Sequence, residues 1–238
     1  MKLDILVFAA HPDDAELSCG GTIALQISKG HTIGMVDLTR GEIGTRGTPE
    51  IRAEEAANAA KILGLSVREN AGLEDGFIQN NKENQLRIAA YVRKYRPEIV
   101  LTNAVSDRHP DHGRAAALTR DACYIAGLVK LKINPGAEHS GPWRPKALYH
   151  YIQSDYIDPD FIVDISGFWK SKLDAIRAHK SQFFDPKSTD PETYISNPLF
   201  LEFIEARCKQ WGHAINAVYG EGFTVERTIG IRNLADLL

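Results

Sequence analysis

The 238-residue sequence is poor in the features that mark several large classes of protein. It has only three cysteines, Cys19, Cys123 and Cys208, without CxxC spacing, which argues against a disulfide framework and against a thiolate metal site. No apolar run approaches the roughly 20 residues that span a membrane. The apolar run that ends before His11 is too short and too acid-flanked for a signal peptide. We therefore expect a cytoplasmic protein.

Strong net charge is also missing. The formal charge is -3, with 43% hydrophobic and 25% charged residues, as in an ordinary globular protein. This balance gives no reason to expect nucleic acid or a membrane surface as a partner. The chain shows no internal repeat and no linker that would divide it. We therefore expect a single domain over residues 1–238.

Strand-like apolar runs alternate with helix-like segments through the first half of the chain. This alternation predicts an α/β fold with a Rossmann-like, mostly parallel sheet of order 3-2-1-4-5, further strands near the C-terminus, and helices on both faces. The predicted strands are 5–10, 33–38, 66–70, 98–103, 147–152 and 161–165, followed by an extended stretch at 223–231. The predicted helices are 15–29, 50–63, 84–95, 114–129, 168–179 and 197–219.

Two short clusters, His11-Pro12-Asp13-Asp14 and His109-Pro110-Asp111-His112, occupy equivalent places in this pattern. Each follows an apolar strand and precedes a helix. In a sheet of order 3-2-1-4-5 the two strands are neighbours, and ligands bind at the crevice between their carboxyl ends. We therefore expect the two clusters to form one site.

The ligand-type residues in these clusters predict a metal centre. His11, Asp14 and His112 supply two imidazoles and one carboxylate, and three protein ligands with an open position are typical of catalytic zinc. The same set also binds non-haem Fe²⁺, so the metal is Zn²⁺, Fe²⁺ or another divalent ion. Asp13 is placed to accept a proton from metal-bound water, and His109 is a second acid–base group. This combination predicts a hydrolase.

Two other functions are compatible with parts of the pattern. A two-histidine, one-carboxylate iron enzyme uses the same ligands, but such enzymes usually have all-β barrels. A nucleotide-binding module would suit the fold, but Gly20-Gly21 is not a G-x-G-x-x-G fingerprint. The acidic first turn would also repel a pyrophosphate.

The paired clusters resemble those of the PIG-L/LmbE-like family of zinc-dependent N-deacetylases, and the likeness extends over most of the chain. The loop Gly44-Thr45-Arg46-Gly47 and the segment Glu221-Gly222-Phe223 are similar to the bacillithiol-biosynthesis branch. Members of that branch remove acetate from N-acetylglucosaminyl malate. Further family-like segments are residues 73–76 and 179–182.

The resemblance implies an LmbE-like fold and a reaction in which metal-bound water attacks an acetamide. It implies that His109 stabilises the oxyanion or protonates the leaving amine, with Asp111 tuning it. It also implies zinc ligands and a general base that match the residues chosen above: His11, Asp14 and His112 as ligands, and Asp13 as base.

Substrate binding is also implied by the resemblance. Arg52 matches a substrate-binding arginine, and Tyr194 is similar to a loop tyrosine that covers the reacting carbonyl. Because malate is dianionic, Arg46 and Arg108 are further candidates for its docking site. Other N-acetyl sugars, such as a chitooligosaccharide or an inositol conjugate, are alternative substrates. The family implies a homo-oligomer, namely a hexamer.

Overall fold

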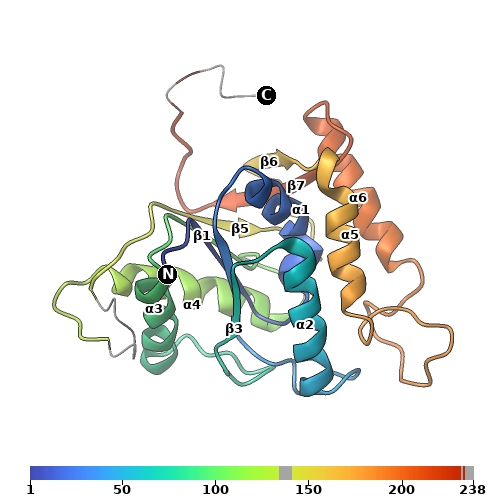
Figure 1. Ribbon diagram of the computed structural model, residues 1–238, viewed down its shortest axis with the longest axis horizontal. Coiled ribbons are helices and arrows are strands. Elements are labelled where there is room, and N and C mark those ends of the chain that lie inside the picture. The colour runs from blue at the N-terminus through green and yellow to red at the C-terminus, as the bar shows by residue number, and fades with distance from the viewer. Residues whose placement is uncertain (134–140, 232, 234–238) are drawn as a thin grey trace.

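A seven-stranded sheet forms the centre of the computed structural model, which describes residues 1–133, 141–231 and 233 (Figure 1). In that part of the chain the strand order is β3-β2-β1-β4-β5-β7-β6. Strands β1 to β5 are parallel, whereas β7 runs antiparallel to β5 and β6. The predicted order 3-2-1-4-5 with added C-terminal strands is confirmed. The bounds are β1 Ile5–Ala9, β2 Ile33–Asp37, β3 Val67–Asn70, β4 Ile99–Thr102, β5 Ala147–Tyr151, β6 Phe161–Asp164 and β7 Gly220–Val225.

Strand β1 lies inside the sheet and is buried from end to end. It pairs with β2 on one side and with β4 on the other, so that Val7 is level with both Met35 and Leu101. The carboxyl ends of β1 and β4 therefore lie side by side. The chain leaves these ends toward α1 (Asp14–Ser28) and α4 (Pro110–Ala126), which makes this edge the switch point of the sheet.

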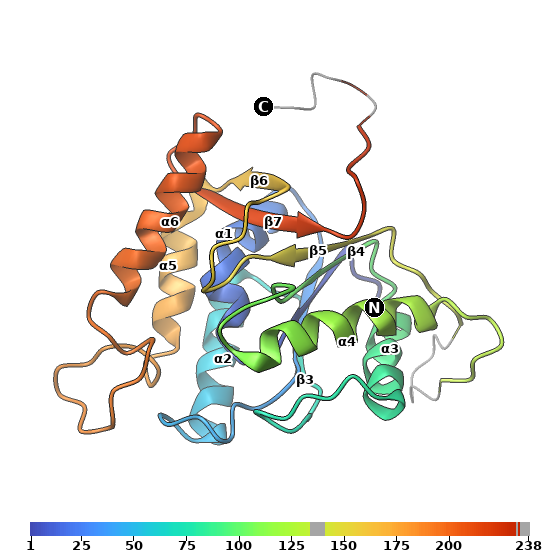
Figure 2. The same ribbon diagram turned by 180° about the vertical axis from the view of Figure 1, so that it is seen from behind.

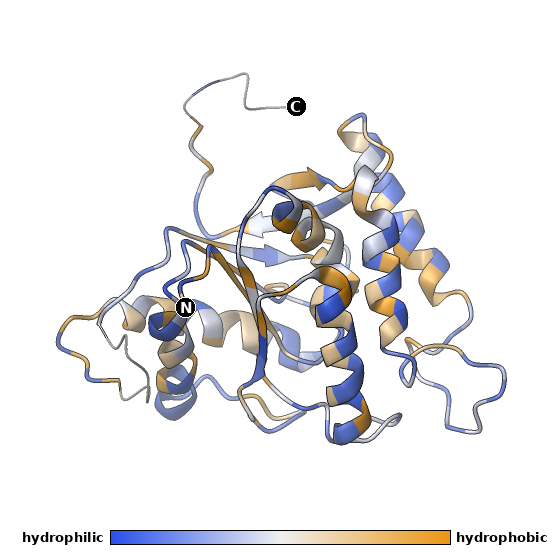
Figure 3. Ribbon diagram, in the orientation of Figure 1, coloured by the Kyte–Doolittle hydropathy of each residue, from blue (hydrophilic) through white to orange (hydrophobic). Residues whose placement is uncertain are grey.

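Helices cover both faces of the sheet, as predicted (Figures 1 and 2). Leu6 and Phe8 point to the face covered by α3 (Lys82–Tyr95) and α4, where they share an apolar core with both helices. The alternate residues of β1 share a second core with α1, α2 (Pro49–Leu63) and α5 (Trp169–Ala178). Figure 3 shows the apolar strands between these layers. Among the described residues, no helix combines the length and the hydropathy needed to cross a membrane.

Two helices differ from the sequence prediction by more than two residues at an end. Helix α4 begins at Pro110 rather than Arg114, because the ring of His109 accepts a hydrogen bond from the backbone of Asp111 and caps the helix. Helix α6 (Phe200–Ala214) is shorter than the predicted 197–219. Asn216 has a φ of 59° and turns the chain back onto Gly212, where a Cβ would lie 2.7 Å from the Val218 carbonyl oxygen. Strand β7 likewise ends at Val225 rather than at residue 231.

A buried ion pair gives Glu221, in the segment Glu221-Gly222-Phe223, a structural role. Helix α1 is interrupted at Cys19, whose φ of -134° is not helical, so the next turn has free N–H groups. Those of Gly21 and Thr22 donate to the Glu221 carboxylate at 3.0 and 2.6 Å. The Lys172 ammonium neutralises the same carboxylate inside the core. Glu221 thereby fixes the helix that Asp14 begins.

Candidate metal centre and active site

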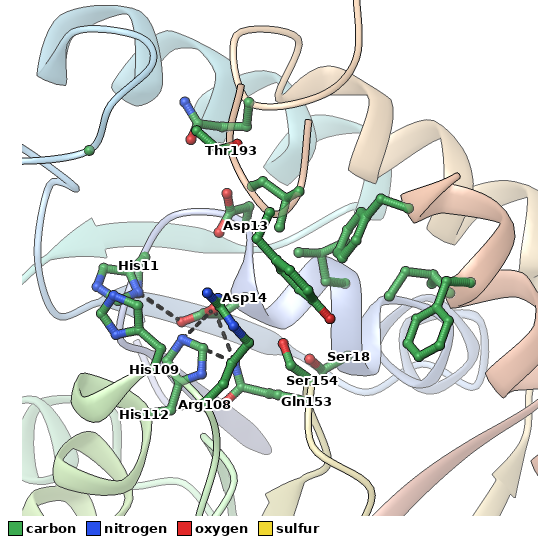
Figure 4. Close-up of a pocket in the computed structure, with 18 of the residues that line it drawn as sticks. His11, Asp13, Asp14, Ser18, Arg108, His109, His112, Gln153, Ser154 and Thr193 are labelled. Carbon is green, nitrogen blue, oxygen red and sulfur yellow. Dashed lines mark hydrogen bonds and ion pairs between the residues drawn. The ribbon is translucent and has the colours of Figure 1, made fainter. Parts of the chain in front are cut away.

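The histidines of the two clusters meet at the carboxyl ends of β1 and β4 (Figure 4). The ring centroids of His11 and His109 are 4.6 Å apart, and those of His109 and His112 are 5.0 Å apart. One nitrogen from each of the three rings lies within 4.8 Å of the other two. The structure therefore brings together clusters that lie about a hundred residues apart in the sequence.

The Asp14 carboxylate lies between two of these rings. Its Oδ2 is 3.5 Å from Nδ1 of His11, and its Oδ1 is 3.1 Å from Nε2 of His112. The side-chain amides of Asn103 and Gln153 each donate to one of its oxygens at 3.0 Å. Burial alone would raise the pKa of Asp14, but the two histidines hold it well below its ordinary value. Asp14 is thus an oriented, ionised carboxylate in a buried position.

The outer nitrogens of the same two rings contact other carboxylates. Nδ1 of His112 is 2.5 Å from Asp107, and Nε2 of His11 is 3.0 Å from Asp75 and 3.6 Å from Asp111. Burial lowers the pKa of both rings, but their carboxylate partners raise it, to about 9 for His112 and well above its ordinary value for His11. A carboxylate on the outer nitrogen is the usual way to orient a metal-binding imidazole.

This donor set fits a divalent transition metal. Two imidazole nitrogens face one shared carboxylate, and further carboxylates surround the rings, so the centre has an excess of negative charge that a cation would neutralise. The three histidines form one group with ligand atoms within 4.8 Å of one another, and His11, Asp75 and Asp111 form a second. Because these acids lie at the outer nitrogen of His11, they suit the orienting role better.

Asp13 lies beside the centre in a strained backbone conformation. It caps α1 with φ 127° and ψ -26°, a region that residues with a Cβ rarely adopt. Its carboxylate is buried, and Nη2 of Arg52 approaches it at 3.3 Å while also donating to the Pro12 carbonyl at 2.8 Å. Burial raises the pKa of Asp13 to about 6, although Arg52 opposes the shift. Asp13 is therefore a stronger base than an exposed aspartate.

Arg52 and Arg46 are both bound to protein groups. Nη1 of Arg52 donates to the Gly41 carbonyl at 3.3 Å. The φ of 66° and the missing Cβ of Gly41 let the guanidinium approach the backbone there. Nε of Arg52 is buried and has no hydrogen-bond partner within the described ranges. Arg46 donates to the Phe183 carbonyl at 3.2 Å and to Ser188 at 2.6 Å. Arg46 thereby ties its glycine-rich loop to the segment that follows α5.

His109 presents a hydrogen-bond donor to the centre. Its Nδ1 accepts the Asp111 backbone N–H at 3.3 Å, so a neutral ring carries its proton on Nε2. Burial and the nearby rings of His11 and His112 lower its pKa. The Asp111 carboxylate points elsewhere and accepts the N–H of Gly76 at 2.7 Å.

A cavity of about 390 Å³ opens onto the centre. The Arg108 guanidinium lies 4.1 Å from the ring centroid of Tyr194, which is 44% exposed and packs edge-on against Phe200. Of the ten candidate residues from the sequence, only Asp111 lies behind the cavity wall rather than in it. The nine that line the cavity are His11, Asp13, Asp14, Arg46, Arg52, Arg108, His109, His112 and Tyr194.

Comparison with known proteins identifies the family. Residues 6–123 match the PIG-L family, described as GlcNAc-PI de-N-acetylase. The diacetylchitobiose deacetylase of Thermococcus kodakarensis is 31% identical over 189 residues, which cover 75% of this chain and 70% of that protein. The chain belongs to the PIG-L family. It is therefore an enzyme of a de-N-acetylase family.

Other proteins similar to this chain carry names of more than one activity. The solved structure of the conserved protein TT1542 from Thermus thermophilus has a TM-score of 0.87 and 37% identity, with 98% of each chain covered. A probable N-acetyl-alpha-D-glucosaminyl L-malate deacetylase 2 of Bacillus cereus is 26% identical over 195 residues, covering 76% of this chain and 84% of that protein. The 4-oxalmesaconate hydratase of Pseudomonas putida is 31% identical over 192 residues, covering 74% of this chain and 73% of that protein.

Three residues of this PIG-L site were given no role from the sequence. Asn103 follows β4 and Gln153 follows shortly after β5, so both lie at the same edge of the sheet as the metal centre. Their position after adjacent parallel strands is the signal that could have found them. Asp107 lies two residues before the second cluster and holds the outer nitrogen of His112.

Proposed function

We propose that residues 1–238 form one deacetylase domain that removes the N-acetyl group from an N-acetylglucosamine conjugate. N-acetylglucosaminyl malate is the favoured substrate. The observation that carries the proposal is the Asp14 carboxylate between two imidazole nitrogens, with the second buried carboxylate of Asp13 on the same cavity. PIG-L membership supports amide hydrolysis, and the Bacillus cereus relative supports the malate conjugate.

The proposed metal ligands are His11, Asp14 and His112. Zn²⁺ is the proposed ion, and Fe²⁺ or another divalent metal suits the same donors. Such a metal, when bound, would polarise the acetamide carbonyl and lower the pKa of a water to about 7. Asp75 and Asp107 would keep the two imidazoles oriented by accepting their outer N–H groups.

Asp13 is the proposed general base. Its carboxylate accepts the proton of the attacking water, a role that its raised pKa favours. Arg52 holds the carboxylate in place through a contact of 3.3 Å, and the Asp13 side chain lines the cavity and makes no capping hydrogen bond to α1. A positioned general base contributes about 10²–10⁴-fold to the rate.

His109 is the proposed acid and oxyanion donor. The proton on its Nε2 can bind the developing oxyanion or pass to the leaving amine, and the Asp111 backbone N–H keeps the other nitrogen occupied. Asp111 thus acts on His109 through its backbone. Tyr194 is the proposed second donor, since its ring lines the cavity from the loop before α6.

The sugar end of the substrate is assigned to Arg52 and the loop that Arg46 anchors. Arg52 lines the cavity and is the proposed donor to a sugar hydroxyl, since its Nε has no hydrogen-bond partner within the described ranges. Chitooligosaccharides and inositol conjugates of N-acetylglucosamine are the alternative substrates, since relatives at 24–31% identity carry names of these kinds.

Amine release over a panel of amides tests the proposal. We expect the metal-loaded enzyme to release amine and acetate from N-acetylglucosaminyl malate with a higher kcat/KM than from N-acetylglucosamine, diacetylchitobiose or the inositol conjugate. We expect the same amine release in the absence of oxygen. An iron oxygenase, which needs oxygen, would not show it. Hydration of 4-oxalmesaconate, followed by absorbance, is the control for the hydratase reaction. Hydration without amine release from any amide would refute the proposal.

A further inference from the structure

Two arginines of the cavity lack carboxylate partners. Arg108 precedes α4 and Arg207 lies in α6, and both line the cavity that holds the metal centre. Within the described ranges neither forms an ion pair, whereas the guanidinium groups of Arg46 and Arg52 are bound to protein oxygens. Arg108 was a candidate from the sequence, but Arg207 lies in no motif.

Arg207 is held in place with part of its guanidinium group unused. Its Nη2 donates to the Ser154 carbonyl at 2.5 Å. The guanidinium carbon lies 5.1 Å from the ring centroid of Phe203 and 5.8 Å from that of Trp211. In the described part of the chain, Nε and Nη1 form no hydrogen bond. These contacts fix the side chain and leave donors for a ligand.

A short series of contacts places the two arginines near each other. Asp107, next to Arg108 in the chain, accepts the backbone N–H of Asp155 at 2.7 Å. The neighbouring residue, Ser154, holds Arg207. The Tyr194 ring centroid lies 4.1 Å from the Arg108 guanidinium, and Tyr194 is also close enough to Arg207 to affect its pKa. The two guanidinium groups therefore belong to one end of the cavity.

This end of the cavity suits an anion. Burial lowers the pKa of Arg207, although Tyr194, Asp107 and Asp155 oppose the shift, which indicates a partly desolvated cation. Phe200, Ile204 and Trp211 form an apolar wall, and a charge pair is stronger there than in water. A carboxylate would satisfy the free donors of Arg207 and neutralise its charge, whereas a neutral ligand would leave that charge unpaired.

We infer that Arg207, together with Arg108, binds a carboxylate on the group attached to the sugar, and so selects anionic conjugates over neutral ones. The inference rests on the proposed deacetylation and adds a specificity-determining residue to it. A guanidinium suits this role because its planar fork binds a carboxylate through two parallel hydrogen bonds. If Arg207 served only to hold the segment at Ser154, its loss would affect anionic and neutral substrates equally.

Substrate selectivity of Arg207→Gln tests the inference. The readout is the ratio of kcat/KM for N-acetylglucosaminyl malate to kcat/KM for the methyl glycoside of N-acetylglucosamine. We expect this ratio to fall about 10–100-fold, mainly through KM for the anionic substrate, because a hydrogen bond to a charged group is lost. Arg207→Lys should give a smaller loss. Arg177→Gln, on the exposed side of α5, is the matched control and should keep the ratio.

Binding of L-malate by calorimetry separates this inference from the proposed function. We expect wild-type protein to bind L-malate and Arg207→Gln to bind it about 10-fold or more weakly. If no amide is cleaved but malate binding depends on Arg207, the deacetylase proposal fails and this one stands. If amine is released but the selectivity ratio and malate affinity are unchanged in Arg207→Gln, the carboxylate site is refuted.

Discussion

Asp13→Asn is expected to retain the metal and lose about 10²–10⁴-fold in kcat, because the substitution removes the general base and no proposed ligand. Asparagine is among the residues that best tolerate a positive φ, so the strained turn at position 13 should persist. The hydrogen bond from Arg52 can pass to the amide oxygen. Metal content by mass spectrometry and amine release on the same sample measure the two effects together.

The control for Asp13→Asn is Asp185→Asn in the exposed loop before α6, which should keep both metal and activity. An Asp13→Asn protein that no longer binds metal would show that Asp13 is a ligand. A protein with nearly full activity would show that another group accepts the proton.

Asp14→Ala is expected to lose the metal itself. The Asp14 carboxylate is the group that both His11 and His112 face, and its removal leaves two imidazoles with a gap between them. The loss of affinity should exceed the roughly 10–100-fold that follows from losing an outer partner of a ligand. Competition with a fluorescent zinc chelator measures the affinity, and circular dichroism shows whether the variant folds.

Asp107→Asn gives the graded comparison, because Asp107 contacts only the outer nitrogen of His112 among the proposed ligands. We expect the zinc affinity of Asp107→Asn to lie between those of the wild type and Asp14→Ala. If Asp14→Ala binds zinc as tightly as Asp107→Asn does, Asp14 is not a ligand. The second group, with His11, Asp75 and Asp111, would then be the better candidate centre.

The sequence was sufficient to predict how the site is assembled. The apolar runs that become β1 and β4 each end in a His-Pro cluster, and the alternation of strands and helices placed these strands side by side. Pro110 favours an extended backbone at His109, which has φ -87° and ψ 122°, but the predicted start of α4 at Arg114 was four residues too late. The meeting of His11, His109 and His112 followed from this order.

Other features depend on contacts that no local pattern encodes. Asn103 and Gln153 orient Asp14 from strands far away in the sequence, and amides after a strand are common in loops of every kind. Arg207 stands in an ordinary amphipathic helix, where an arginine usually faces solvent. The early end of α6 depends on Gly212, whose missing Cβ leaves room for the chain that turns back onto the helix. Each of these is a tertiary effect that overrides or adds to local propensity.

The most direct test of the central claim is to remove the metal with a chelator and titrate it back while acetate release from N-acetylglucosaminyl malate is followed. We expect activity to fall to background and to return in proportion to added Zn²⁺, reaching a plateau at about one ion per chain, as three protein ligands with an open position predict. Asp13→Asn should bind the same amount of metal without regaining activity. Full acetate release by metal-free protein would contradict the account.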